Sequence, residues 1–165
     1  VSNPVYSKDK GFIMLQDLAE SITIGTFMIL ATFLIHAYSL DRLLVIIRRF
    51  LPYARDESSP YHHTWQIMIL LLTGFGTICI HSLEIWLWAF LYLYLDIQAV
   101  RDLETSVYFS MVSFTTVGYG DVVLEPYDRI LSGMQATSGM LLFGWSTAYI
   151  FEVISVTYNR LRIRN

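Results

Sequence analysis

Residues 115–121 read Thr-Thr-Val-Gly-Tyr-Gly-Asp, and the two glycines at alternate positions are the feature that could carry chemistry. Successive carbonyl groups of an extended strand point to opposite sides, so turning them all to one side requires alternating left- and right-handed backbone conformations. Glycine adopts the left-handed ones without steric cost. The carbonyl oxygens of residues 116–119 and a threonine hydroxyl can then face one axis and replace the water shell of a dehydrated ion. The expected ion-binding residues are Thr116, Val117, Gly118, Tyr119 and Gly120.

The same string is also compatible with the glycine-rich turn of a β-hairpin. The strands of a hairpin are short runs in which apolar and polar residues alternate. Long apolar blocks flank this string instead. The flanks therefore disfavour a hairpin, and they are the elements that must position the string.

The composition indicates a membrane protein. Hydrophobic residues make up 55% of the 165 residues and charged residues only 15%. The mean hydropathy of +0.49 is also hard to reconcile with a water-exposed surface. The apolar residues form three long blocks, at 22–40, 64–95 and 130–154. Each is long enough to cross a hydrocarbon core, which takes about 20 helical residues, so we predict an all-α membrane protein with three transmembrane helices.

The segment that leads into the glycine string differs from these blocks. Residues 102–114 are too few, and too polar at their start, to form a fourth span. We predict that they form a re-entrant helix, which enters the membrane and returns through residues 115–121. Non-helical backbone at membrane depth is tolerated only inside protein or beside water. The string is therefore expected to line a path enclosed by protein.

The basic residues predict the orientation, because cytoplasmic loops carry an excess of Lys and Arg. Most arginines lie between the first and second blocks and after the third: Arg42, Arg48, Arg49, Arg55, Arg160, Arg162 and Arg164. The N-terminus is therefore expected outside and the C-terminus in the cytoplasm. Residues 95–129 then face outward, and acidic residues outnumber basic ones there. Such a segment would concentrate cations at the external mouth.

The string and its flanks resemble the pore domain of potassium channels over residues 64–156. The resemblance implies an outer helix at 64–95, a pore helix at 102–114, a selectivity filter at 115–121 and an inner helix at 128–156. It also implies a homotetramer, because one pore loop supplies one strand and cyclic symmetry must supply the others. The positions that it assigns to bound potassium are Thr116, Val117, Gly118 and Tyr119.

Outside the pore domain we predict an external N-terminal segment at 1–21, a first transmembrane helix at 22–41, a cytoplasmic basic connector at 42–63 and a cytoplasmic basic tail at 157–165. Apolar and polar residues mix at 11–20, as is typical of a helix that lies along the membrane interface. The same residues are equally compatible with an extension of the first helix. Pro52 and Pro60 favour a connector.

Comparison with the family pattern, residue by residue, predicts altered bracing of the filter. Tyr108 and Phe109 occupy positions at which many relatives have tryptophans, and Tyr108 keeps a hydroxyl that can donate to Asp121. Phe109 has no polar atom to offer the Tyr119 hydroxyl. Val112 stands where some relatives have a buried glutamate that pairs with the filter aspartate. The expected supporting residues are Thr115, Asp121, Tyr108, Phe109 and Val112.

The third apolar block predicts a face that lines a cavity. Steps of three or four residues from Thr147 give the set Ala136, Met140, Phe143, Thr147, Phe151 and Ser155. Phe151 would close the pore as part of an apolar ring, or else it packs, like Phe143, against the outer helix. Gly139 and Gly144 match small positions at which the family hinges its inner helix. Gly139 is equally suited to close helix packing.

Ionisable residues inside apolar blocks are functional candidates, because burying them in a membrane is costly. His81 and Glu84 lie three residues apart on one helical face and can pair. We predict a structural clamp on the filter's scaffold that responds to external pH, since histidine changes charge nearest neutrality. The alternative is a satisfied buried pair with no regulatory role. His36, His62 and His63 are expected near the cytoplasmic side, where no carboxylate or thiol completes an obvious metal site. We therefore expect these three histidines to lie at the membrane interface and not to form a metal site.

The favoured function is a potassium-selective channel that conducts passively through a homotetrameric pore. The alternatives are a weakly selective cation channel, and a membrane subunit of a coupled transporter or a non-conducting sensor with a channel-like fold. No nucleophile and base, metal-ligand set or phosphate-binding loop occurs at a spacing that would form a catalytic site. We therefore expect no enzyme activity, and no cofactor apart from the permeant potassium. Expected partners are further copies of the chain and membrane lipids, with no nucleic acid and no small-molecule substrate. A run at 81–88 that is similar to one in bacterial channels implies a bacterial plasma membrane.

Overall fold

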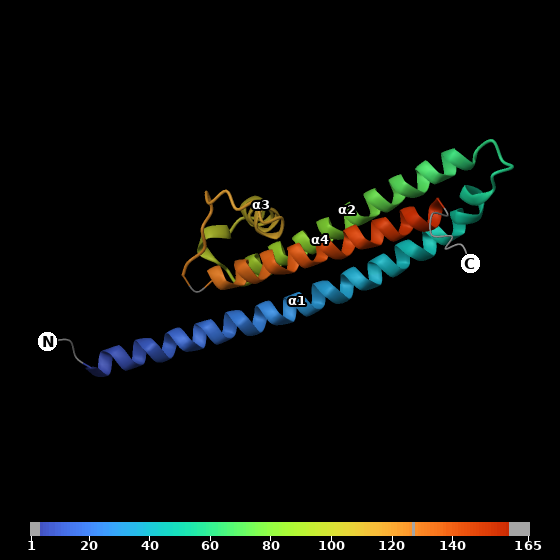
Figure 1. The fold of residues 1–165 in the computed structure, drawn as a ribbon. Coiled ribbons are helices and arrows are strands. Elements are labelled where there is room, and N and C mark those ends of the chain that lie inside the picture. The colour runs from blue at the N-terminus through green and yellow to red at the C-terminus, as the bar shows by residue number, and fades with distance from the viewer. Residues whose placement is uncertain (1–3, 127, 159–165) are drawn as a thin grey trace. The chain divides into compact units, whose positions relative to one another are not determined.

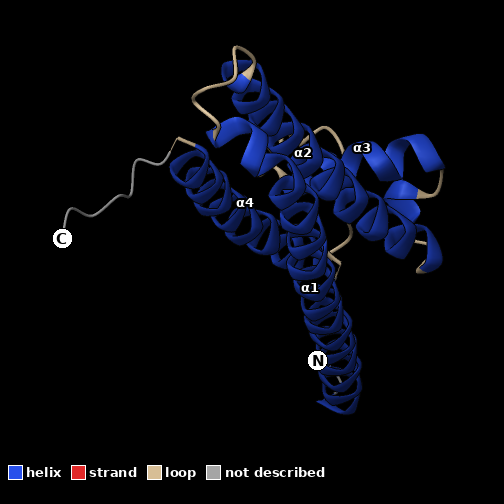
Figure 2. Ribbon diagram, turned by 90° about the vertical axis from the view of Figure 1, so that its right-hand side faces the viewer, coloured by secondary structure: helices blue, strands red, loops and turns tan. Residues whose placement is uncertain are grey.

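The computed structural model describes residues 4–126 and 128–158. Its helices, which Figure 1 shows in chain order, are α1 (Pro4–Arg55), α2 (His62–Tyr94), the short 3-10 helix η1 (Gln98–Val100), α3 (Leu103–Phe114) and α4 (Arg129–Thr157). The described residues contain no strand, so only helices and loops are drawn in Figure 2. The predicted all-helical class is therefore confirmed.

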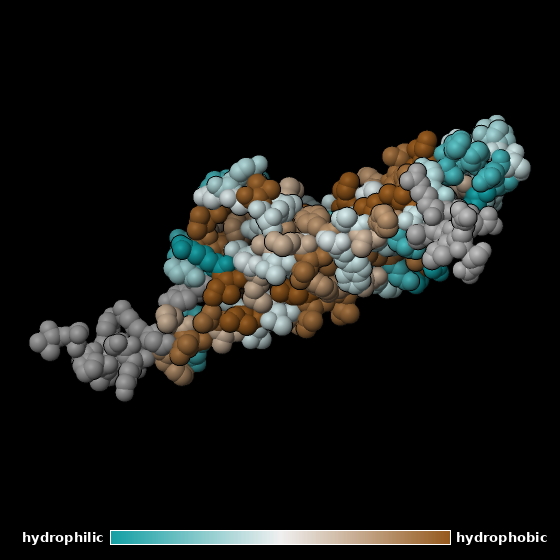
Figure 3. Space-filling model, viewed as in Figure 1, coloured by the Kyte–Doolittle hydropathy of each residue, from teal (hydrophilic) through white to brown (hydrophobic). Residues whose placement is uncertain are grey.

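Three helices are long and apolar enough to cross a membrane: Met14–Arg55 within α1, together with α2 and α4. Many of their large apolar side chains are exposed on the single chain, such as Phe27 at 71%, Leu34 at 72% and Phe75 at 69%. Figure 3 shows apolar side chains over much of the visible helical surface, and hydrophilic ones gathered at the turn that joins α1 to α2. Such surfaces need lipid or neighbouring chains to cover them, as expected of a multi-pass membrane protein.

The first helix is longer than predicted. It runs without a break through residues 11–20, as in the extension alternative, and continues to Arg55, beyond the predicted transmembrane segment at 22–41. Pro52 lies inside the helix, although proline usually breaks one. Leu43 and Ile47 are only 7% and 2% exposed, and packing of this apolar face sustains the helix. The predicted basic tail falls almost wholly on residues 159–165, outside the described residues.

The chain divides into two compact units, of which unit 1 comprises Val1–Thr32 and Ile85–Met140. It contains η1, α3 and the adjoining parts of the three long helices. The Asp102 carboxylate caps the start of α3 by accepting a hydrogen bond from the Thr105 backbone N–H at 2.9 Å, which satisfies an N–H that has no partner inside the helix. This bond lowers the pKa of Asp102 below its usual 3.8. The largest fully buried side chains of unit 1 include Trp88, Tyr92, Phe114, Leu131 and Gln135.

Unit 2 comprises Phe33–Glu84 and Leu141–Asn165, and contains the remaining parts of α1, α2 and α4. The helices meet over a buried apolar cluster formed by Leu40, Leu43, Ile47, Ala54, Ile69, Ile80 and Val153. The Arg55 guanidinium donates to the Val156 carbonyl at 2.8 and 3.2 Å. This contact joins the end of α1 to the end of α4.

Candidate functional site

The string at 115–121 leaves α3 with alternating backbone handedness. Thr116, Gly118 and Gly120 have φ angles of 61°, 55° and 77°. The left-handed conformations of the two glycines agree with the sequence prediction, whereas that of Thr116 was not predicted. A non-glycine residue held there costs of order 1–3 kcal/mol, and such strain persists only where the surroundings impose it.

The backbone N–H groups of the string turn back onto α3. Val117 and Gly118 both donate to the Val112 carbonyl, at 3.0 and 3.3 Å, and Thr116 donates to a carbonyl one turn back at 3.0 Å. Within the part of the chain that the structure describes, the carbonyl oxygens of residues 116–119 accept no hydrogen bond. These oxygens are therefore available as ligands for a cation.

A side-chain hydrogen bond ties α3 to the far end of the string. The Tyr108 hydroxyl donates to Asp121 Oδ2 at 2.6 Å, so the contact that the sequence predicted is present. The bond lowers the pKa of the Asp121 carboxyl below its usual 3.8 and raises the pKa of Tyr108 above 10.0. Both effects favour a neutral phenol beside a carboxylate.

The other predicted supporting residues make different contacts, and their support of the string stays a prediction. Phe109 is 7% exposed, and its ring lies edge-on to Tyr92 with the centroids 5.2 Å apart. Val112 acts through its backbone carbonyl rather than its side chain. The Thr115 hydroxyl donates to the Met111 carbonyl at 2.7 Å, which closes the last turn of α3.

Polar contacts that were not predicted from the sequence hold α3 in unit 1. The Ser110 hydroxyl donates to the Ile85 carbonyl of α2 at 2.6 Å, and Ser106 makes the same kind of bond one turn earlier. Gln135 of α4 donates from Nε2 to Ser110 Oγ and accepts from the Tyr92 hydroxyl, both at 2.7 Å. The available signal was the presence of single Ser and Gln residues among apolar ones, since buried polar groups must find partners.

The residues of the predicted cavity face of α4 differ in exposure on the single chain, and their place along a cavity stays a prediction. Met140, Phe143, Thr147 and Phe151 are exposed on the single chain, with Phe151 at 66%. Ser155 is 4% exposed and is packed within unit 2, unlike the other four residues. Each four-residue step overshoots one helical turn by about 40°. Two such steps from Thr147 rotate Ser155 off the face.

The two predicted hinge glycines have different surroundings. A Cβ on Gly139 would lie 2.0 Å from the Phe114 carbonyl oxygen, whereas a Cβ on Gly144 would meet no heavy atom within 4 Å. Gly139 therefore permits a close approach between α4 and the end of α3. Hinge motion at either glycine stays a prediction.

His81 and Glu84 pair as predicted, with His81 Nδ1 2.9 Å from Glu84 Oε2. His36 joins them, with its Nδ1 2.8 Å from Glu84 Oε1. The prediction that no carboxylate completes a set with His36 is therefore wrong, because Glu84 of α2 lies beside it. The two histidines at the start of α2 lie beside each other, with ring centroids 3.8 Å apart and the rings tilted by 39°. The pH response of the pair stays a prediction.

Comparison with known proteins identifies one family. A family model described as an ion channel matches residues 67–156, which is more than half of the chain. The match takes in most of α2, all of α3, the string and nearly all of α4. No curated protein and no solved structure matches the chain.

Proposed function

The chain belongs to the ion channel family whose pattern spans residues 67–156, and we propose that it is a potassium-selective channel of the plasma membrane. In this proposal four copies surround one axial pore, and ions flow passively down their gradient. Residues 115–121 form the selectivity filter, and α3 is the re-entrant pore helix that holds it. The N-terminus lies outside and the C-terminus in the cytoplasm.

The main support for the proposal is the hydrogen bonding of the backbone groups in the string, where the first N–H groups are paired within the described chain and the carbonyl groups are not. Its first N–H groups are bonded to α3, while the carbonyl oxygens of residues 116–119 accept no hydrogen bond from the described residues. Every second residue from Thr116 to Gly120 has a positive φ, as needed to turn successive carbonyls toward one side. A backbone with paired donors and open acceptors suits a cation, and four such strands would replace the hydration shell of potassium.

Electrostatics support the same proposal. The C-terminal end of α3 adjoins the string at Thr115, and the C-terminus of a helix carries partial negative charge that favours cations. Burial, with the nearby carboxylates of Glu125 and Asp17, raises the pKa of Asp128 above its usual 3.8. Acidic groups therefore crowd together before α4, where they would concentrate cations at the external mouth.

Fourfold assembly accounts for apolar side chains that the single chain leaves exposed. Val117 is 53% exposed, Tyr119 is 72% exposed and Met111 of α3 is 49% exposed. Neighbouring subunits would cover such side chains. The side chains of Val117 and Tyr119 then wedge each strand against its surroundings while the carbonyls face the axis.

A weakly selective cation channel is the second candidate. The observation that favours it is the environment of Phe109, which packs on Tyr92 and offers no polar atom to Tyr119. A filter that lacks this lateral bond has fewer restraints on its diameter. Permeability to sodium then rises relative to potassium.

Flux into sealed vesicles tests the channel function. Vesicles that contain only the purified protein should take up potassium down a gradient without a second substrate. Gly118→Ala should abolish uptake, because alanine is strained at a φ of 55°, while the matched Gly133→Ala variant, at an open helical position, should retain it. Absence of uptake by the wild type would contradict a channel, and uptake that requires a second ion gradient would indicate a coupled transporter.

A further inference from the structure

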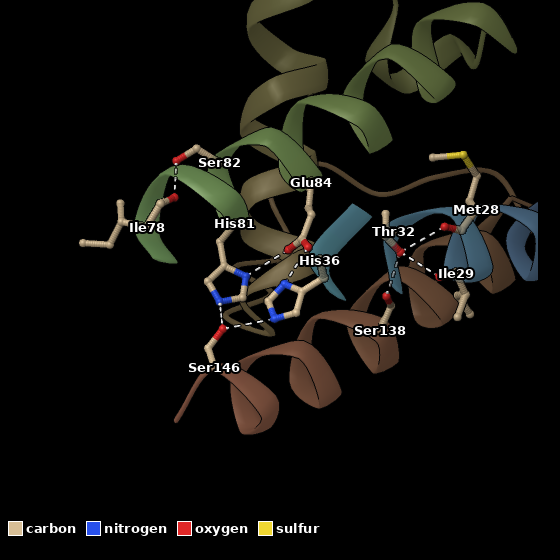
Figure 4. Close-up of polar contacts among 10 residues, drawn as sticks. All are labelled: Met28, Ile29, Thr32, His36, Ile78, His81, Ser82, Glu84, Ser138 and Ser146. Atoms are coloured by element: carbon tan, nitrogen blue, oxygen red, sulfur yellow. Dashed lines mark hydrogen bonds and ion pairs between the residues drawn. The ribbon is translucent and has the colours of Figure 1, made fainter. Parts of the chain in front are cut away.

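We propose that His36, His81 and Glu84 form a binding site for a divalent transition-metal ion of the zinc class. The three residues lie in unit 2, on α1 and α2, and Ser146 of α4 borders them, as Figure 4 shows. One ligand atom from each lies within 4.8 Å of the others. The proposal is independent of which ion the pore conducts.

The ligand atoms already lie close together, none more than 4.8 Å from another. The Nδ1 atoms of His36 and His81 point at the two oxygens of the Glu84 carboxylate, at 2.8 and 2.9 Å. Zinc bonds of about 2.0–2.2 Å at a tetrahedral angle place neighbouring ligand atoms roughly 3.4 Å apart. Each nitrogen–oxygen gap therefore has to open by roughly half an ångström, which modest side-chain rotation supplies. The metal would then take the place of the two Nδ1 protons that face the carboxylate, and each neutral ring would carry its one proton on Nε2 instead.

Ser146 supplies the outer contact that such a site needs. Its Oγ lies 2.9 Å from His81 Nε2 and 3.3 Å from His36 Nε2. A histidine that binds a metal through Nδ1 carries its hydrogen on Nε2 and almost always donates it to a partner. A hydroxyl oxygen has two lone pairs. Ser146 can therefore accept both Nε2–H groups at once and fix the orientation of both rings.

Burial and ligand type define the class of ion. His36 and Glu84 are 0% exposed and His81 is 8% exposed, and buried charges are paired or coordinate metals. Two imidazole nitrogens and one carboxylate oxygen suit zinc and its neighbours, whereas magnesium and calcium prefer oxygen ligands alone. Three protein ligands leave a fourth position for a small exogenous ligand. Hydroxide or chloride there would cancel the net charge of the ion and Glu84.

Titration with Co²⁺ tests the site directly. The protein is purified through a tag without histidine, stripped with a chelator and kept as the assembled channel in detergent. The expected result is one Co²⁺ per chain, seen by visible absorption and displaced by Zn²⁺. The Trp145 ring lies 5.4 Å from the His36 ring, so bound Co²⁺ should quench its fluorescence. Trp145→Phe should remove most of the quenching and keep the absorption band.

Variants localise the binding. His36→Gln and Glu84→Gln should weaken Co²⁺ binding by more than the ~10–100-fold that loss of an outer contact costs, and Ser146→Ala should fall within that range. The double variant His62→Gln, His63→Gln is the matched control and should bind as the wild type does. Absence of stoichiometric Co²⁺ binding by the wild type would overturn the proposal. The three side chains would then share a proton instead of holding a metal ion. Equal binding by His36→Gln would also overturn it. The wild type and Trp145→Phe decide the question even where a ligand variant fails to assemble.

Discussion

The carbonyl oxygen of Phe114 lies 2.0 Å from the point that a Cβ on Gly139 would occupy. Phe114 is the last residue of α3, so this approach fixes where α3 ends and where the string begins. Any side chain at position 139 must displace backbone rather than a flexible side chain. The positions of the first carbonyls of the string therefore depend on the absence of a side chain from α4 at this point.

Gly139→Ala should destabilise the protein by about 1–3 kcal/mol, the usual cost of overpacking. Gly133→Ala is the control, since a Cβ there meets nothing within 4 Å and alanine is the better helix former by up to ~1 kcal/mol. Denaturant unfolding in detergent measures both. Equal stability of the two variants would show that the end of α3 does not pack closely against Gly139. A stable Gly139→Ala channel with altered opening would favour the hinge instead.

Gln135→Leu should cost about 1–3 kcal/mol of stability, because it leaves the buried Tyr92 hydroxyl without its acceptor. Tyr92→Phe should then cost less in the Gln135→Leu background than in the wild type. A double-mutant cycle of unfolding free energies should give a coupling of about 0.5–3 kcal/mol. Additive losses would mean that the bond between these side chains does not stabilise unit 1.

The hydrogen bond between Tyr108 and Asp121 should determine the pH range over which this bond stabilises the string. The lowered pKa of Asp121 gives a stabilisation that is complete above 3.8 and is lost as the pH falls through the lower folded value. The raised pKa of Tyr108 gives a stabilisation that is complete below 10.0 and is lost as the pH rises through the higher folded value. Tyr108→Phe should move the Asp121 titration, followed by carbon NMR of labelled aspartate, back toward 3.8. An unchanged titration would mean that the bond does not form in solution.

Phe151→Ala should raise the open probability of the channel, because Phe151 is 66% exposed on the single chain and is predicted to close the pore by dewetting. Leu141→Ala is a suitable control, since Leu141 is 57% exposed and lies off the predicted cavity face. Single-channel recordings measure the open probability of each variant. Equal open probabilities would support a packing role for Phe151.

Local chemistry was predictable, and contacts between distant segments were not. The left-handed glycines and the bond between Tyr108 and Asp121 follow from neighbouring residue types. The pairing of His36 with Glu84 depends on the register of α1 against α2, which the residue types along either helix do not determine. The strain at Thr116 was missed for a different reason. Threonine does not favour that conformation, so only the surrounding structure can impose it.

Reversal potentials measured with potassium on one side of a bilayer and sodium on the other give the sharpest test of potassium selectivity. We expect a single conductance that reverses far toward the potassium equilibrium potential, carried by the open carbonyls of residues 116–119. Gly118→Ala should lose this current, and Gly133→Ala should keep it. Reversal near zero, with sodium and potassium equally permeant, would contradict potassium selectivity.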